Sequence, residues 1–237
     1  MMLPELRILL AAVPSDAGRA EYCAAIVDDN VLGKPTFSSR RKSEEHLYEL
    51  YGLDPFLALF RLLRRFADED RDSLPLLALT CAFCRDAQLR VSFDLIEDLK
   101  PREALPRERM EAHFESLFPN RYSAAVRSAL SSHVGTTWAA AGHLVGKAIK
   151  RKAKPEPRTA ASTYAMFAGY LLGLRGEILM SSVFARLVGA DPSVIVAHLS
   201  AAARNGWLRF RHAGGVTEID FTSLLLPEEE ALLHGAH

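Results

Sequence analysis

The sequence predicts a mainly helical protein with one small β-hairpin near its C-terminal end. Alanine, leucine and arginine dominate residues 17–138, and no segment there alternates apolar and polar side chains as a half-buried strand would. Residues 207–211 and 216–221 do alternate, and they flank two glycines that suit a tight hairpin turn. Sequence signals for the beginnings and ends of helices predict helices over most of the remaining chain.

The first predicted helices lie between residues 16 and 52. We expect Asp16 to cap a helix that runs to about Asn30, and a loop with Gly33 and Pro35 to follow. The next predicted helix runs from about residue 39 to residue 51 and ends at Gly52. These two helices would form a helix-turn-helix-like unit at about 16–52.

Further helix signals follow as far as residue 141. Asp54 directly before Pro55 favours a helix through residue 66, because a side-chain cap followed by proline fits the first helical positions. Ser73 begins another helix. The segments 87–99, 107–118 and 123–141 are also predicted to be helical. Residues 1–145 are therefore expected to form an N-terminal helical domain.

Two helices are predicted just before the hairpin. The first covers 178–187, with Ile178 on its apolar face, and stops at Gly189. The second covers 192–205, begins with the capping pair Asp191-Pro192 and ends at Gly206. Helix, short turn, helix and hairpin is the order of a winged helix-turn-helix. Residues 159–237 are therefore predicted to form such a module with a short tail.

The second helix of this module has an outer face of small side chains. At 100° per residue, the apolar positions 195, 196, 199, 202 and 203 face inward, and Ser193, Ser200 and Arg204 face outward. Small side chains permit close approach to a groove but offer few hydrogen bonds to base edges. If this helix meets DNA, we expect weak sequence discrimination.

The hairpin carries two arginines that face acidic residues. A turn centred on residues 214–215 places Arg211 opposite Glu218 and Arg209 opposite Asp220, so these pairs neutralise each other. Winged modules also serve as protein-docking domains. Nucleic-acid binding and docking therefore both remain open for this module.

Arg40, Arg41 and Lys42 form a second candidate site, in the first turn of a predicted helix. The helix dipole disfavours cations there, so something should compensate for their charge. One interpretation is local pairing, of Arg40 with Glu44 and of Arg41 with Glu45. The other is a bound phosphate, to which hydroxyls and free N–H groups would also donate. The candidate residues are Lys34, Thr36, Ser38, Ser39, Arg40, Arg41 and Lys42.

Residues 147–158 are the most basic stretch, with six basic residues against one acidic residue and hence a net charge of plus five. Two prolines within it predict a basic linker, or an exposed hairpin, at 146–158 between the two domains. One interpretation is a solvated linker. The other is a strip that contacts a nucleic-acid backbone, because each neutralised phosphate releases counterions. The candidate contacts are Lys147, Lys150, Arg151, Lys152 and Lys154.

Composition and missing motifs exclude several classes of protein. The net charge is zero, so any nucleic-acid binding must come from local patches. Cys81 and Cys84 lack further ligands at zinc-site spacing and are predicted to be buried helical thiols. Nucleotide-binding, nucleophile-elbow and zinc-protease motifs are absent, as is an apolar run that could span a bilayer. We expect a cytoplasmic, non-enzymatic protein without catalytic residues, metal, cofactor, membrane contact or small-molecule substrate.

Several blocks occur in a specific order over about residues 16–226. They are Asn30-Val31-Leu32 with Lys34, Thr36 and Ser39-Arg40-Arg41; Leu50-Tyr51-Gly52-Leu53-Asp54; Pro75-Leu76-Leu77-Ala78-Leu79; Phe118-Pro119 with Tyr122-Ser123; Trp138 with Ala141-Gly142-His143-Leu144; Gly173-Leu174-Arg175-Gly176-Glu177; and Gly206-Trp207-Leu208 with Glu218-Ile219. In this order they resemble the BrxA family, a component of BREX (bacteriophage exclusion) phage-defence systems in bacteria.

The resemblance implies a small, largely helical, non-enzymatic protein that binds double-stranded DNA through helix-turn-helix units at both ends. It also implies work beside a methyltransferase, an ATPase and other defence proteins. The family has been likened to the RNA-binding factor NusB. An RNA-binding protein and a scaffold that docks other defence subunits are therefore the alternatives.

Overall fold

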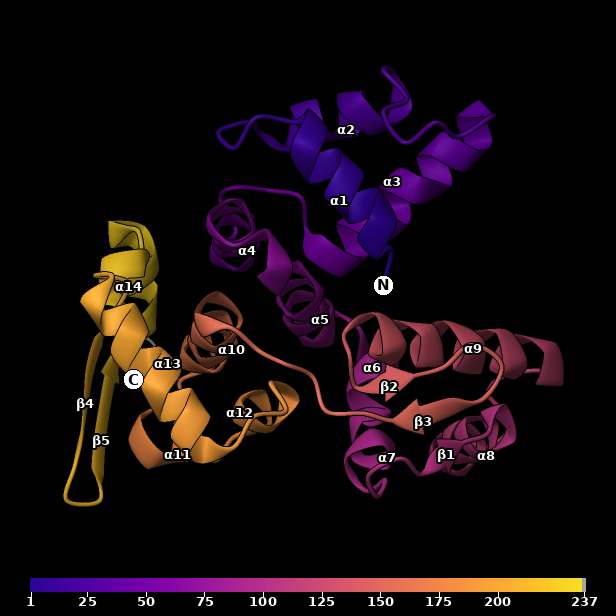
Figure 1. Cartoon of the computed structure of the whole chain (residues 1–237). Coiled ribbons are helices and arrows are strands. Elements are labelled where there is room, and N and C mark those ends of the chain that lie inside the picture. Colours follow the sequence, from indigo (N-terminus) through magenta and orange to yellow (C-terminus); the bar gives the residue numbers. More distant parts are fainter. Residues whose placement is uncertain (236–237) are drawn as a thin grey trace.

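Helix α10 (Thr159–Leu171) is the element around which the other helices pack in the computed structural model, which describes residues 1–235 (Figure 1). Residues 160–170 of α10 are all buried. A helix that is apolar all round has to be covered on every side. Helices from both halves of the chain cover it: α4 (Ala58–Glu69), α5 (Leu74–Arg85), α12 (Val183–Leu187) and α13 (Pro192–Arg204).

The N-terminal part consists of three helices, α1 (Leu3–Ala12), α2 (Arg19–Val27) and α3 (Phe37–Tyr51). The predicted cap at Asp16 is wrong, because α2 begins after Gly18. Helix α3 begins two residues earlier than predicted, because Thr36 caps it. As predicted, α3 ends at Gly52, whose φ of 81° is accessible to glycine.

Helix α4 begins later than its sequence signal predicted. Asp54 Oδ1 accepts a hydrogen bond from the Phe56 backbone N–H at 2.9 Å, which closes a local turn in place of a helix cap. The helix starts only at Ala58, and the Phe56 side chain is 83% exposed. After a short 3₁₀ turn, Arg71–Ser73, helix α5 begins at Leu74 as predicted.

The segment predicted as one helix at 87–99 is two short helices, α6 (Ala87–Val91) and α7 (Phe93–Glu97), which meet at Ser92. Ser92 is fully buried. Its hydroxyl donates to the Leu89 carbonyl oxygen at 2.8 Å and accepts from Trp138 Nε1 at 2.8 Å. A tertiary hydrogen bond to the indole therefore accompanies the break. Helices α8 (Arg107–Leu117) and α9 (Ala124–Ala140) lie where they were predicted.

The basic segment 146–158 is not a free linker. Its residues Lys150–Lys152 form strand β3, which lies between β1 (Ala104–Leu105) and β2 (Leu144–Val145) in a small antiparallel sheet. Arg151 pairs with Ala104 on one side and with Val145 on the other. Of the two predicted alternatives, linker and exposed hairpin, the structure therefore shows the hairpin. Strand β1 joins the hairpin β2–β3 as the third strand of the sheet.

The C-terminal part follows the predicted order of helices and hairpin, with one correction. The segment 178–187 is divided into α11 (Gly176–Met180) and α12, and Ile178 is 68% exposed, so its predicted inward orientation is wrong. Helix α13 leads to the hairpin β4 (Arg209–Ala213) and β5 (Val216–Asp220). A 3₁₀ turn, Thr222–Leu224, and α14 (Pro227–Gly235) complete the described chain; residues 236–237 of the predicted tail lie outside it.

Cys81 and Cys84 lie on α5, as predicted, and both are free thiols. Burial raises the pKa of Cys81 to about 12 and that of Cys84 to about 11. Both thiols therefore stay protonated at neutral pH. Within residues 1–235, no single helix is long and apolar enough to cross a membrane; residues 176–187 and 192–204 reach that length and composition only as a pair bent by 104°.

The buried bond between Ser92 and Trp138 can be tested by substitution. Ser92→Ala leaves the Trp138 N–H without a partner, so we expect the free energy of unfolding to fall by about 1–3 kcal/mol in urea titrations. Ser132→Ala, at an exposed position of α9, is the control and should change it by less than about 0.5 kcal/mol. Equal effects of the two substitutions would contradict this role of Ser92.

Candidate nucleic-acid interface

Residues at the N-terminus of α3 are largely engaged in internal contacts. The Thr36 hydroxyl accepts from the Ser39 N–H at 3.1 Å, and Ser39 Oγ donates to the Thr36 carbonyl oxygen at 2.8 Å. The Lys34 ammonium lies 3.0 Å from a Glu5 carboxylate oxygen. These three candidate residues already have protein partners, so a phosphate would have to compete for them.

Arg40 is directed towards the neighbouring helix. Its Nη1 donates to the Val27 carbonyl oxygen, at the C-terminal end of α2, at 2.7 Å. The predicted pairing of Arg40 with Glu44 is wrong, because Glu44 forms its ion pair with Arg19. Because α3 begins at Phe37, the three cations start only at its fourth residue, where the dipole acts less strongly. The exposed candidate residues are Thr36, which is hydrogen-bonded to Ser39, and Ser38, Arg41 and Lys42.

Two cations in and just after the hairpin β2–β3, Lys152 and Lys154, have partners within the protein. Lys152 is half-buried, and its Nζ donates to the Ile96 carbonyl oxygen at 2.7 Å. Burial lowers the pKa of the Lys152 ammonium. Lys154 Nζ lies 3.0 Å from Asp191 Oδ2, so Asp191 forms an ion pair and does not cap α13 with its side chain as predicted.

Arg102 joins the free cations of this hairpin and was missed by sequence reasoning. Its backbone N–H donates to the Lys152 carbonyl oxygen at 3.1 Å, and its own carbonyl oxygen accepts from Arg151 Nη1 at 3.3 Å. We call Arg102, Lys147, Lys150 and Arg151 the hairpin patch. Within residues 1–235, none of these four has a carboxylate oxygen within 4.0 Å. A hollow of about 550 Å³ beside β3 is lined by the three hairpin members of the patch and by residues of α8 and α9.

The outer face of α13 is exposed and carries little hydrogen-bonding capacity. Ser193 and Arg204 are exposed, whereas Ser200 is half-buried and its hydroxyl donates to the Val196 carbonyl oxygen at 2.8 Å. Ile195 and Leu199 are buried on the inner face, as predicted. This face is therefore shaped for close approach more than for reading base edges.

The hairpin β4–β5, the wing of the predicted module, has the predicted register. Arg209 pairs with Asp220 and Arg211 with Glu218 across the strands, and in both pairs the nearest charged atoms are 3.9 Å apart. Both arginine side chains are 87% exposed. Such exposed, loosely held pairs contribute little to stability, so these arginines are free to reorient.

Arg175 and Glu177 flank Gly176 at the start of α11, but within residues 1–235 they do not form an ion pair with each other. The Arg175 guanidinium stacks over the Tyr170 ring at 3.5 Å from its centre, and its Nη1 donates to the Tyr170 carbonyl oxygen at 2.6 Å. Glu177 accepts instead from the Thr217 hydroxyl on β5. Glu177 therefore joins α11 to the hairpin β4–β5, and Arg175 packs on the end of α10.

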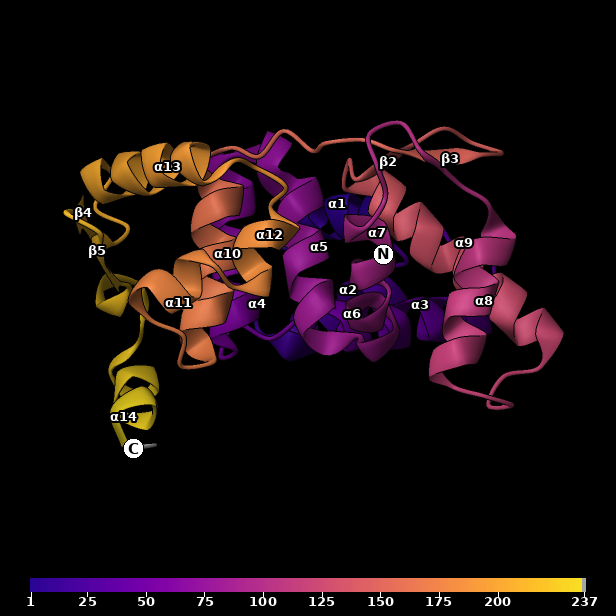
Figure 2. The ribbon, with the colours of Figure 1, turned by 90° about the horizontal axis from the view of Figure 1, so that it is seen from below.

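The hairpin β2–β3 and α13 lie along the same edge of the molecule, as Figure 2 shows, and both lie towards the viewer in Figure 1. Helix α3 lies apart from that edge in both views. The structure therefore brings the hairpin patch and α13 onto one side, and it does not bring the α3 cations to them.

His143 and Pro155 hold the hairpin against the C-terminal part. His143 Nε2 donates to the Leu187 carbonyl oxygen, at the end of α12, at 3.0 Å. Pro155 packs against Gly189, where a Cβ would lie only 2.4 Å from the proline ring. The residues that flank β2 and β3 thus contact the end of α12 and the turn that leads to α13. No family model, curated protein or solved structure matches the chain.

The buried histidine makes stability depend on pH. Burial lowers the pKa of His143 to about 4, so between about pH 6.5 and 4 the unfolded chain binds a proton that the folded protein rejects. The contribution of His143 to the free energy of unfolding should therefore be constant above pH 7 and fall by about 2 kcal/mol at pH 5.

Urea titrations of the wild type and of His143→Gln at pH 7.5 and pH 5 test this expectation. The glutamine variant cannot titrate, so it should lose less stability between the two pH values by about 2 kcal/mol. Any loss of stability that the substitution causes equally at both pH values cancels when the change between pH 7.5 and pH 5 is compared for the two proteins. The same pH dependence in both proteins would contradict a neutral, buried His143.

Proposed function

We propose that this protein binds double-stranded DNA with little sequence preference, through the hairpin patch and α13. The observation that supports this most is a group of four cations without a carboxylate partner within residues 1–235, in a chain whose net charge is zero. The hairpin that carries three of them lies along the same edge of the molecule as α13. Such a local patch attracts a phosphate backbone although the molecule as a whole is neutral.

The expected mode is contact with the DNA backbone and not base readout. The small outer side chains of α13 let the helix enter a groove closely, and Ser193 and Arg204 are its exposed polar groups. On the wing, Arg209 and Arg211 can exchange their weak ion pairs for phosphates. The proposal therefore combines many charge contacts with few sequence-specific ones.

We further propose that the protein is a non-enzymatic accessory component of a BREX phage-defence system and a member of the BrxA family. This part rests on the ordered sequence blocks over about residues 16–226. In that setting, DNA binding would operate beside a methyltransferase and an ATPase in the cytoplasm.

A docking function is the second candidate. Two large apolar side chains, Val145 and Ile149, are 60% and 56% exposed on the hairpin that carries the patch. Apolar groups among cations are typical of a protein-binding surface as well as of a DNA-binding one. The two functions differ in the steepness of their response to salt, because binding to a nucleic-acid backbone releases condensed counterions.

The first test removes the three hairpin cations together, in Lys147→Ala/Lys150→Ala/Arg151→Ala. We expect the affinity for a fluorescent 20-base-pair duplex to fall at least about tenfold at 0.1 M salt, because up to three phosphate contacts are lost. The slope of log affinity against log salt should decrease by up to about 2.7. Fluorescence anisotropy measures both quantities.

Arg121→Ala is the matched control, because Arg121 is an exposed cation in the turn between α8 and α9, away from the edge that carries α13. The affinity of this variant for the duplex and its slope of log affinity against log salt should both stay within error of the wild-type values. Unchanged affinity in the triple variant would reject the patch as a DNA site. If single-stranded RNA displaces the duplex at lower concentration than unlabelled duplex does, the ligand is RNA.

A second substitution tests whether α3 belongs to the same interface. Arg41→Ala/Lys42→Ala removes the exposed cations of α3, which lie apart from α13. For a 12-base-pair duplex, too short to reach around the molecule, we expect an affinity within about twofold of the wild type. A loss as large as that of the hairpin variant would mean that α3 forms the main contact.

A further inference from the structure

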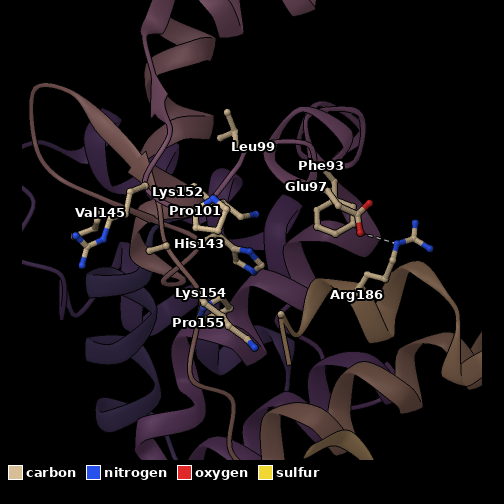
Figure 3. Close-up of a pocket in the computed structure, with 13 residues that line it drawn as sticks. Phe93, Glu97, Leu99, Pro101, His143, Val145, Lys152, Lys154, Pro155 and Arg186 are labelled. Carbon is tan, nitrogen blue, oxygen red and sulfur yellow. Dashed lines mark hydrogen bonds and ion pairs between the residues drawn. The ribbon is translucent and has the colours of Figure 1, made fainter. Parts of the chain in front are cut away.

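A cavity of about 470 Å³ lies between α7, the hairpin β2–β3 and the turn from α12 to α13 (Figure 3). Its walls are mostly apolar, and Phe93, Leu99, Pro101, Val145 and Pro155 line it. This volume lies within the range of about 300–1,000 Å³ that is usual for small-molecule sites. The cavity takes no part in the proposed DNA contacts, apart from the side chain of Arg102 at its lining.

The charged groups of the cavity favour an anion. Lys152 Nζ donates one hydrogen bond, to the Ile96 carbonyl oxygen, which leaves two of its three donors for another partner. Arg102 adds a second cation without a carboxylate partner within the described chain. Among the lining residues the only carboxylate is Glu97, and its Oε1 is already 2.8 Å from Arg186 Nε (Figure 3).

His143 forms a neutral, flat part of the wall. Because Nε2 donates to the Leu187 carbonyl oxygen, Nδ1 is the unprotonated nitrogen and can accept one hydrogen bond. The depressed pKa of His143 agrees with this tautomer at neutral pH. Beyond this acceptor and the cations, the side chains offer few polar groups to a ligand.

We propose that this cavity binds a small amphipathic anion, with an apolar aromatic or aliphatic body and one carboxylate or sulfonate group. The body would fill the space among Phe93, Leu99 and Pro155, and the anionic group would contact Lys152 and Arg102. A nucleotide fits less well, because its base and sugar would bury polar groups that this wall cannot satisfy. An uncharged ligand would leave the Lys152 ammonium with only the attraction of Glu97, whose carboxylate is already paired with Arg186.

Anilinonaphthalene sulfonate is a suitable probe, since it joins an aromatic body to one sulfonate and fluoresces when bound. Its uncharged analogue N-phenylnaphthylamine reports on apolar binding alone. We expect saturable one-to-one binding of the sulfonate to the full chain in the absence of DNA. Lys152→Met keeps the side-chain volume and removes the charge, so it should weaken sulfonate binding about tenfold and change binding of the analogue by less than about twofold.

Two further variants locate the site. Ala153→Phe places a ring in the cavity and should weaken both probes at least about tenfold, with the fold checked by circular dichroism. Lys147→Met removes a hairpin cation outside this cavity and should leave both affinities unchanged. Should Lys152→Met not fold, Arg102→Met provides the same comparison of charged and uncharged probe.

The proposal is overturned if the sulfonate does not bind saturably, if Lys152→Met leaves its affinity unchanged, or if Lys147→Met weakens it equally. Since these titrations contain no DNA and Lys152 is outside the hairpin patch, their result is independent of the DNA-binding tests. If Lys147→Ala/Lys150→Ala/Arg151→Ala loses duplex binding but binds the sulfonate normally, the two sites are separate.

Discussion

The complete burial of α10 is the constraint on which the arrangement of this protein depends. A helix without an exposed face needs neighbours on all sides, and here they come from α4 and α5 before it and from α12 and α13 after it. The buried residues of both halves consequently form one cluster. Because α13 is held in this core, its outer face has a fixed position relative to the hairpin β2–β3, and the two share one edge of the molecule.

Electrostatics in this protein depends on which cations already have partners. The basic positions most prominent in the sequence divide sharply: Lys34 and Lys154 are paired with carboxylates, and Arg40 and Lys152 donate to carbonyl oxygens. The two ion pairs neutralise charge locally, and the two carbonyl contacts direct Arg40 and Lys152 towards the protein. Apart from Arg41 and Lys42 on α3, the cations left over among these positions lie on β3 and beside it, where Arg102 joins them from a distant part of the chain. A small cluster of this kind is enough to create a local positive potential on a neutral chain.

The junction between the hairpin β2–β3 and α12 both positions the hairpin patch and encloses a cavity. It fixes the patch relative to α13, through the bond from His143 to Leu187 and through the close packing of Pro155 on Gly189. It also encloses the apolar cavity, whose walls come from α7, the hairpin and the turn before α13. A ligand in that cavity would contact the hairpin and the turn that leads to α13, the segment that joins the two elements proposed to meet DNA.

Local patterns in the sequence determined the fold class, most helices, the wing and its register, because helical periodicity, the stop at Gly206 and the glycine pair of the hairpin act over a few residues. They failed where a distant contact decided the outcome. The break at Ser92 accompanies a bond to Trp138, and strand β3 exists because residues near Ala104 lie beside it. The same holds for the candidate site: Lys147, Lys150 and Arg151 were predicted from a charge run, whereas the sequence could not reveal that Asp191 neutralises Lys154 or that Arg102 joins the patch. Charge content is a property of the sequence, but the pairing that leaves some charges free is decided by tertiary packing.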